Sequence, residues 1–289
     1  MNDDAVLTVD DLSIDYLGAT TVHAVRNVSF TLRRGELLGL AGESGCGKST
    51  LAYGINQLLR PPAVITSGSV AFHDRADGDI DVLALTGRSL RAFRWDKVSM
   101  VFQGSMNSLN PVISVRAQLE DVFTTHRPGM SKAERRVRAR DLLELVGVER
   151  GRLTSFAHEL SGGMRQRVMI AMALALEPQL MIMDEPTTAL DVVVQREILG
   201  ELQRLRSELG FAVLFITHDL PMLLEISDRV AVMRDGEILE TGIPEDIFFA
   251  ARHPYTRRLL TSFPSLTGER GDFIRTGAGV DDEEKVTQR

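Results

Sequence analysis

The sequence predicts an α/β fold: a parallel sheet buried on both faces, joined by an antiparallel β subdomain near the N-terminus and an inserted α-helical subdomain. Three observations predict it. Four apolar runs have the length of strands, which is typical of strands covered on both faces. Most of them neighbour helical patterns along the chain. The first third of the chain instead carries short runs in which apolar and polar residues alternate, as in an antiparallel sheet.

The strands are expected in chain order as follows. The runs at residues 6–9, 13–16 and 27–32 predict the antiparallel sheet, and residues 33–36 predict a turn after it. The apolar runs predicted to form the parallel sheet are residues 37–40, 98–102, 180–183 and 212–216, of which the second is the most polar.

Residues 106–160 contain no strong strand pattern. Ser131 and Glu134 form a capping-box pattern, apolar residues follow at helical spacing, and Gly147 stands where a C-terminal cap belongs. We therefore expect a main domain over residues 5–250 that carries a small helical insert at about 106–165. A short extension over residues 251–289 follows, and its polar end from residue 266 is expected to be a mobile terminus.

Composition excludes several classes of protein. The longest unbroken apolar run, residues 168–176, has nine residues, whereas a membrane-spanning helix needs about 20. The acidic first residues argue against a secretory signal and for a cytoplasmic protein. The single cysteine, Cys46, makes no internal disulfide and is a poor start for a zinc or iron–sulfur site. The net charge of −7 weighs mildly against nucleic-acid binding.

A phosphate-binding pattern directly follows the strand that ends at Ala41. Residues 42–49 match G-x-x-x-x-G-K-[ST], a match expected by chance on the order of once in a hundred such chains. Its glycines let several backbone N–H groups face one anion, Lys48 can reach the β- and γ-phosphates, and the Ser49 hydroxyl can ligate Mg²⁺. The following helix adds its positive dipole end. The pattern predicts nucleoside triphosphate binding on a RecA-like P-loop NTPase core, by Gly42, Glu43, Ser44, Gly45, Cys46, Gly47, Lys48, Ser49 and Thr50.

For Cys46, filling space near the phosphates is the favoured interpretation and a redox switch the alternative.

Two further strand ends carry side chains suited to hydrolysis. Asp184 and Glu185 end the apolar run at 180–183. In a P-loop ATPase such an Asp holds Mg²⁺, usually through water, and the adjacent Glu can polarise the attacking water. His218 ends the run at 211–217, at the edge where ligands bind in open α/β sheets.

The segment Leu-Ser-Gly-Gly-Met-Arg-Gln-Arg at residues 160–167 resembles the signature motif of ATP-binding cassette (ABC) ATPases. A Ser-Gly-Gly turn that opens a helix is an anion site, although it could by itself be only a helix N-cap. The remaining family pattern is present in order over about residues 5–250. Tyr16 resembles the aromatic residue that stacks on adenine, Gln103 the Q-loop glutamine, residues 189–191 the D-loop, and His218 the switch histidine.

The resemblance implies a set of roles for these residues, with ATP and Mg²⁺ as cofactors. Glu185, His218 and Gln103 are implied to be catalytic, and Ser49, Gln103 and Asp184 to serve the metal. Beyond the phosphate loop, the residues implied to contact nucleotide are Tyr16, Ser161, Gly162, Gly163 and Asp191. In the family the signature faces the ATP held by a second cassette, so the active unit is expected to be a pair.

Four segments resemble the oligopeptide/dipeptide importer branch, which is similar across importers of peptides, nickel and oligosaccharides. They are residues 98–103, 106–111, 158–160 and 253–257. The chain departs from that branch in having no cysteine after Cys46, so we expect no iron–sulfur cluster. Gly104-Ser105 also replaces the usual acidic residue and proline after the Q-loop glutamine.

The implied function is the ATP-hydrolysing subunit of an ABC importer, peripheral on the cytoplasmic face of the cell membrane. Oligopeptides or dipeptides are the first expected cargo, with oligosaccharides or nickel as alternatives. The expected partners are a second ABC ATPase subunit, identical or homologous, two transmembrane permease subunits and, through them, an extracytoplasmic solute-binding protein. No nucleic acid is expected.

A soluble cassette acting on nucleic acid or in translation is the first rival function. It is supported only by the basic stretch at residues 135–140, which a solvated helix face explains. A non-enzymatic regulatory cassette is disfavoured, because every catalytic position carries a competent residue.

Overall fold

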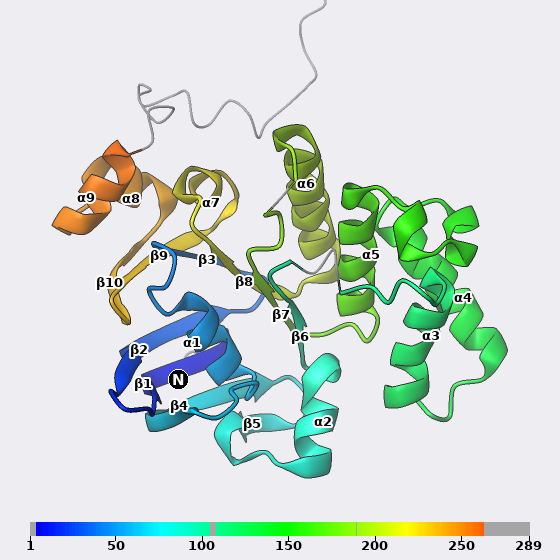
Figure 1. The fold of residues 1–289 in the computed structure, drawn as a ribbon, viewed down its shortest axis with the longest axis horizontal. Coiled ribbons are helices and arrows are strands. Elements are labelled where there is room, and N and C mark those ends of the chain that lie inside the picture. The colour runs from blue at the N-terminus through cyan, green and yellow to red at the C-terminus, as the bar shows by residue number, and fades with distance from the viewer. Residues whose placement is uncertain (1–3, 105–107, 189, 263–289) are drawn as a thin grey trace, which may run out of the picture.

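The computed structural model describes residues 4–104, 108–188 and 190–262, and two sheets organise this part of the chain (Figure 1). The larger sheet has the strand order β10-β9-β3-β8-β7-β6, and the smaller has the order β2-β1-β4-β5. The strands are β1 (Ala5–Tyr16), β2 (Val22–Arg33), β3 (Leu37–Ala41), β4 (Ala63–Asp74), β5 (Gly78–Asp81), β6 (Val98–Val101), β7 (Leu180–Asp184), β8 (Ala212–Thr217), β9 (Arg229–Arg234) and β10 (Glu237–Gly242).

Helices connect the strands and cover the larger sheet. They are α1 (Lys48–Ile55), α2 (Gly87–Asp96), α3 (Val115–His126), α4 (Lys132–Leu145), α5 (Gly162–Leu174), α6 (Val192–Leu209), α7 (Leu220–Ile226), α8 (Pro244–Ala250) and α9 (Pro254–Thr261), with short 3-10 turns η1 (Val82–Ala84), η3 (Arg150–Thr154) and η4 (Ala157–Glu159). Within the described residues, no helix combines the length and the apolar character that crossing a bilayer requires.

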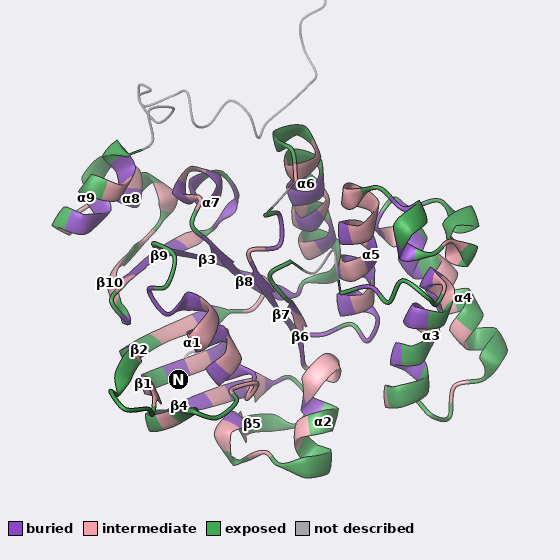
Figure 2. Ribbon diagram, viewed as in Figure 1, coloured by how far each residue is buried: buried purple, intermediate pink, exposed green. Residues whose placement is uncertain are grey.

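The predicted parallel sheet is confirmed. All four apolar runs are neighbouring strands of it, with β3 parallel to β8, β8 to β7 and β7 to β6. Because side chains alternate along a strand, each run serves two cores. Leu38 and Ile182 belong to the core shared with α1 and the smaller sheet, whereas Met181 and Phe215 belong to the core under α5, α6 and α7. Figure 2 shows these central strands buried along almost their whole length.

The antiparallel sheet is also confirmed, with one difference. The predicted runs 6–9 and 13–16 are one strand, β1, which pairs with β2 and with β4. Its register shifts between Val9 and Leu12, where Asp11 has a φ of 46° and its N–H donates to the Ser29 hydroxyl at 2.8 Å. This irregularity breaks the alternation that a sequence pattern depends on. The sequence did not predict β4, whose middle residues are polar and exposed.

Helices α3 and α4 form the predicted insert. Ser131 and Glu134 make the predicted capping box: the Ser131 N–H donates to the Glu134 carboxylate at 2.7 Å, and the Glu134 N–H donates to the Ser131 hydroxyl at 3.2 Å. Gly147, with a φ of 68°, follows the helix end as expected. The insert shares its core with the larger sheet, since Leu143 on α4 lies in the same apolar cluster as Val168 on α5.

Asp74 at the end of β4 fastens the smaller sheet to the larger one. Its carboxylate pairs with Lys97 at 2.8 Å and accepts from Gln179 at 2.6 Å, two residues that precede β6 and β7. Two backbone N–H groups, of Ala76 and Asp77, also donate to it at 2.8 Å. Burial by itself would raise the pKa of Asp74, but these donors outweigh it and lower the pKa to about 2.

The C-terminal part begins with the β9–β10 hairpin and continues as α8 and α9, on the opposite side of the larger sheet from the helical insert (Figure 1). Three sequence predictions fall outside the described residues: the polar terminus from residue 266, positions 106–107 of the importer-branch segment, and position 189 of the D-loop.

Candidate functional site

The larger sheet brings most of the predicted site residues to one edge. β3, β6, β7 and β8 run parallel, so their carboxyl ends lie together. The phosphate loop follows β3, Gln103 follows β6, Asp184 ends β7, and His218 follows β8. Ligands of open α/β sheets bind at this edge.

The phosphate loop is held from behind by two distant segments. Gly47 has a φ of 109°, and a Cβ there would come within 2.2 Å of the Ala24 carbonyl oxygen on β2. A Cβ on Gly42 would come within 2.3 Å of the Met233 carbonyl oxygen on β9. Both contacts require glycine, since any side chain would push the loop out of place. The glycines are therefore needed for packing as well as for exposing N–H groups to a phosphate.

Lys48 folds back over this loop. Its ammonium group donates to the carbonyl oxygens of Gly42 at 2.7 Å and Glu43 at 2.8 Å, and its side chain is 5% exposed. Cys46 lies beside it, buried, with its sulfur 3.7 Å from the ammonium nitrogen. Burial raises the pKa of the Cys46 thiol more than Lys48 lowers it. A buried thiol with a raised pKa is a poor nucleophile, which supports the space-filling interpretation over the redox switch.

Ser49 and Asp184 meet where a metal ion would bind. The Ser49 hydroxyl donates to Oδ1 of Asp184 at 3.0 Å. Oδ2 of Asp184 is buried and has no hydrogen-bond partner among the described residues. Burial raises the pKa of Asp184, and the Ser49 hydrogen bond opposes that rise only in part. A buried carboxylate oxygen without a partner, next to a serine hydroxyl, is the oxygen donor set that Mg²⁺ prefers, so these residues fit the metal.

Glu185 is the centre of a second cluster. Gln103 Nε2 lies 2.9 Å from its Oε2, and His218 Nδ1 lies 3.1 Å from its Oε1. The backbone of Glu185 has a φ of 45°, in the left-handed region, and its N–H donates to the Ile216 carbonyl oxygen at 2.9 Å. Strained backbone of this kind concentrates at functional sites. The structure thus brings together the three residues predicted to be catalytic.

Thr188 is a member of this cluster that the sequence analysis missed. Its hydroxyl donates to Oε2 of Glu185 at 3.1 Å, so both Thr188 and Gln103 hold the same carboxylate oxygen. The signal was present in the sequence, because a hydroxyl residue three positions after a candidate base can reach back to it across a turn. The N–H of Thr188 does donate to the Glu185 carbonyl oxygen at 3.3 Å.

Tyr16 lies at the side of this site. Its phenol oxygen is 3.2 Å from the Thr50 hydroxyl, which places the end of β1 beside the start of α1. An aromatic ring next to a phosphate loop can stack on a base.

The signature residues lie elsewhere in the chain. Ser161 opens α5, which Figure 1 places well away from α1 and the phosphate loop. Its hydroxyl accepts from the Met164 N–H at 3.3 Å, and Asp191 caps α6 in the same way, accepting from the Val194 N–H at 3.0 Å. A Cβ on Gly163 would lie 2.7 Å from Val194, so this glycine lets α5 approach α6. Ser161, Gly162, Gly163 and Asp191 therefore do not join the phosphate loop within one copy of the chain.

A family model described as ABC transporter matches residues 25–188, which is more than half of the chain. The chain belongs to the ABC transporter family. This ABC cassette binds ATP, in agreement with the fold and the motifs described above.

Curated relatives cover most of this ABC cassette. It is 43% identical over 90% of its length to the oligopeptide transport ATP-binding protein OppD of Bacillus subtilis (strain 168), of which it covers 72%. It is 47% identical over 99% of its length to the peptidoglycan transport ATP-binding protein YejF of Agrobacterium fabrum, and 42% identical over 93% to the glutathione import ATP-binding protein GsiA of Escherichia coli (strain K12). The chain spans only 52% of YejF and 44% of GsiA.

Solved ABC cassettes share the fold. The dimeric post-hydrolysis state of the ATP-binding cassette MJ0796 bound to ADP and Pi has a TM-score of 0.71 and 30% sequence identity, over 82% of this chain and 98% of that one. The cbiO1 protein from Clostridium perfringens, part of the ABC transporter complex cbiONQ, has a TM-score of 0.72 and 29% identity, over 91% of this chain and 98% of that one.

Proposed function

We propose that this chain is the ATP-hydrolysing subunit of an ABC importer, bound to the cytoplasmic face of a membrane through its partners. The observation that carries the proposal is the convergence of Lys48, Ser49, Asp184, Glu185 and His218 on one sheet edge. Each has the functional group that ATP hydrolysis needs at its position. Membership of the ABC transporter family supports the interpretation of these neighbouring residues as an ATPase site.

Glu185 acts as the general base. Gln103 and Thr188 fix one of its carboxylate oxygens, and His218 lies against the other. The carboxylate takes a proton from the attacking water as the water oxygen bonds to the γ-phosphorus. The bond between that phosphorus and the bridging oxygen breaks, which leaves ADP and phosphate. His218, exposed beside Glu185, contacts the γ-phosphate and links the base to it.

The phosphates are held by the loop at residues 42–50. Lys48 turns from the loop carbonyls to the β- and γ-phosphates, and Tyr16 stacks on adenine. Ser49 and Gln103 would hold Mg²⁺, with Asp184 behind them. When bound, the ion neutralises charge on the β- and γ-phosphates.

The second cassette supplies the signature. Ser161, Gly162 and Gly163 open α5 away from their own phosphate loop, so they serve an ATP held by a partner copy or homologue. Exposed apolar residues support this interface: Val192 and Val193, directly after Asp191, are 66% and 68% exposed. ATP closes the pair and hydrolysis lets it open, which is a ligand-driven shift between two states.

The membrane subunits dock where the core meets the helical insert. Val112 is 77% exposed, and the exposed side chains of Ile113 and Phe156 accompany it. The segments that carry them are side by side, because Ser114 and Phe156 form a β-bridge and the Val115 N–H donates to the Ser155 carbonyl oxygen at 2.9 Å. An exposed apolar cluster of this kind is typical of a protein–protein contact and suits an amphipathic helix of a permease.

Oligopeptides or dipeptides are the proposed cargo, delivered by an extracytoplasmic solute-binding protein to the two permease subunits. The names of the relatives support this class: oligopeptide transport for OppD, glutathione import for GsiA and peptidoglycan transport for YejF. Each named cargo contains peptide bonds. Import of oligosaccharides or nickel remains the alternative cargo for the same machine.

Co-purification from membranes tests the proposal. The tagged full-length chain should retain two multi-spanning subunits and a second cassette, and the assembly should hydrolyse ATP only with magnesium present. A di- or tripeptide that stimulates this hydrolysis in the presence of the binding protein identifies the cargo. An assembly stimulated only by nickel or an oligosaccharide would replace the peptide assignment while keeping the importer.

The rival functions give different results in simple assays. A cassette that acts on nucleic acid would bind DNA or RNA with an affinity that falls steeply as salt rises. The basic stretch on α4 offers little for this, because Arg138 is engaged with Glu177 and Arg135 with Thr124. A regulatory cassette without enzymatic activity would bind ATP and show no basal turnover.

A further inference from the structure

The C-terminal extension reaches the back of the phosphate loop. Tyr255, on the first turn of α9, is 3% exposed. In the sequence it lies far from the phosphate loop. The guanidinium carbon of Arg234, at the end of β9, lies 4.8 Å from the centre of the Tyr255 ring. The preceding residue of β9, Met233, packs directly against Gly42. Tyr255 therefore belongs to the layer that supports the loop.

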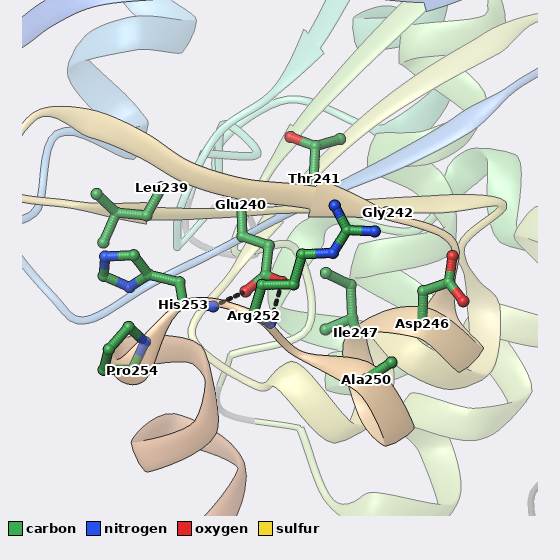
Figure 3. Close-up of a pocket in the computed structure, with 10 residues that line it drawn as sticks. All are labelled: Leu239, Glu240, Thr241, Gly242, Asp246, Ile247, Ala250, Arg252, His253 and Pro254. Atoms are coloured by element: carbon green, nitrogen blue, oxygen red, sulfur yellow. Dashed lines mark hydrogen bonds between the residues drawn. The ribbon is translucent and has the colours of Figure 1, made fainter.

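Glu240 on β10 fixes the position of α9. Its carboxylate accepts the N–H of Arg252 at 2.6 Å and the N–H of His253 at 3.1 Å (Figure 3). His253 in turn accepts the Tyr255 N–H on its Nδ1 at 3.1 Å. Burial by itself would raise the pKa of Glu240, but these N–H groups lower it, so the carboxylate stays charged. A cavity of about 530 Å³ lies beside this clamp, between β10 and α8.

The phenol hydroxyl of Tyr255 is left without a partner. It is buried, and no described group is in hydrogen-bond geometry with it. Burial raises the pKa of Tyr255, and the polar groups that act on it belong to Glu43, through both its backbone N–H and its carboxylate. Leaving a buried hydroxyl unpaired is costly. A small movement of the first residues of the loop would satisfy it.

ATP binding requires such a movement. Lys48 now donates to the carbonyl oxygens of Gly42 and Glu43, and it must leave them to reach the phosphates. The stretch that loses these hydrogen bonds packs through Gly42 against Met233, the neighbour of the Arg234 that lies over the Tyr255 ring. The hydroxyl is therefore placed to hold the loop in its ATP-bound form.

We infer that Tyr255 is a positioning residue for the phosphate loop, whose hydroxyl bonds to Glu43 once Lys48 has turned to the nucleotide. The C-terminal extension thereby raises the affinity of the cassette for ATP without contacting the nucleotide. This inference rests on the proposed ATPase function, since it assigns a further residue to the same site.

Tyr255→Phe in the full-length chain tests the inference, because it removes the hydroxyl and keeps the buried ring. We expect the Kd for magnesium-ATP and the KM for ATP to rise about threefold to tenfold, the equivalent of one hydrogen bond. We expect kcat to stay within about twofold of wild type, because Glu185 and its partners are untouched. A merely structural role would lower Tm and leave the ratio of KM to kcat unchanged.

Thr256→Val is the matched control. It also removes a buried hydroxyl without a hydrogen-bond partner among the described residues from α9, at the residue next to Tyr255. It should leave the ATP affinity unchanged. An unchanged KM and Kd in Tyr255→Phe would overturn the inference, as would an equal rise in the Thr256→Val variant. The wild-type assembly separates the two proposals: if it shows no magnesium-dependent ATP hydrolysis, the ATPase function itself is wrong, whereas normal hydrolysis together with an unaffected Tyr255→Phe overturns only the role of Tyr255.

Discussion

The hydroxyl of Ser49 and the carboxylate of Asp184 are 3.0 Å apart, although one begins α1 and the other ends β7. This contact joins the phosphate loop to the end of β7, which directly precedes the proposed base, Glu185. Asp184 and Glu185 are consecutive residues at the end of β7. Asp184, with one oxygen unpaired among the described residues, is buried, and Glu185 is half-buried. Binding and hydrolysis are thus assigned to adjacent residues of a single strand end, and substitutions can separate them.

Glu185→Gln should bind ATP and lose most hydrolysis. The amide keeps the size of the side chain and cannot accept a proton from water, and loss of a general base costs about 10²–10⁴ in rate. Steady-state turnover of the assembled transporter measures this, with ATP affinity measured in parallel. Glu208→Gln, an exposed substitution on α6, is the control and should behave as wild type. Full turnover by the Glu185 variant would remove this residue from the role of base.

Lys48→Ala should lose nucleotide binding. The ammonium group is buried at the loop and supplies hydrogen bonds from a charged donor, so we expect ATP affinity to fall by at least about tenfold. Equilibrium binding of ATP to the full-length chain provides the measurement. Lys132→Ala removes an exposed lysine at the start of α4 and controls for the change in net charge. Unchanged ATP affinity in the Lys48 variant would contradict the phosphate-loop assignment.

Thr188→Val should lower kcat about threefold to tenfold and leave KM for ATP unchanged. The substitution keeps the shape of the side chain and removes the hydroxyl that holds Oε2 of Glu185. Thr188→Ser restores a hydroxyl and should recover most of the rate. If both variants turn over like wild type, Gln103 and His218 suffice to orient the base.

Asp74→Asn should destabilise the fold by about 2 kcal/mol at neutral pH. The folded pKa of about 2 lies below the usual value of 3.8, and each unit of difference corresponds to about 1.4 kcal/mol. Because the folded pKa is lowered, this stabilisation is present above pH 3.8 and disappears as the pH falls toward 2. Denaturant unfolding at pH 7 and pH 3 should therefore show a difference between the variant and wild type that shrinks on acidification.

Asp79→Asn is the control for that experiment. Asp79 lies on the neighbouring strand β5, and its carboxylate pairs with His73 at the surface. Its loss should cost well under 1 kcal/mol. Equal losses in the two variants would show that the Lys97 and Gln179 contacts of Asp74 carry no special weight.

The sequence predicted best what is local. The phosphate loop, the acid pair and the capping box of Ser131 and Glu134 are each defined by a few consecutive residues, and each is found where expected. The apolar strands were predictable because burial on both faces leaves an unbroken apolar run. The strands β4, β5, β9 and β10 were missed. β4, β5 and β10 have many exposed or half-buried residues and no such run. β9 does have a buried apolar run at residues 230–233, which the sequence analysis overlooked.

Contacts between distant segments could not be read from the sequence. Gly47 looks like any phosphate-loop glycine until the Ala24 carbonyl oxygen is seen against it. The segment at 253–257 suggested only a branch of the family, whereas its tyrosine is buried against Arg234 at the end of β9. The position of Thr188, three residues after Glu185, puts it within reach of that carboxylate, but Thr187 is its neighbour and the sequence does not say which of the two hydroxyls turns toward Glu185.

The strand order also determines how late in synthesis the nucleotide site can form. β3, which leads into the phosphate loop, pairs with β8 on one side and β9 on the other, and neither is translated until more than 170 residues later (212 − 41 = 171). The loop then packs against Met233, which leaves the ribosome later still. A nascent chain therefore carries a complete phosphate-loop sequence long before it has a finished nucleotide pocket. ATP reaches a formed site only when translation of the cassette is nearly complete, and a chain released early would have little affinity for it.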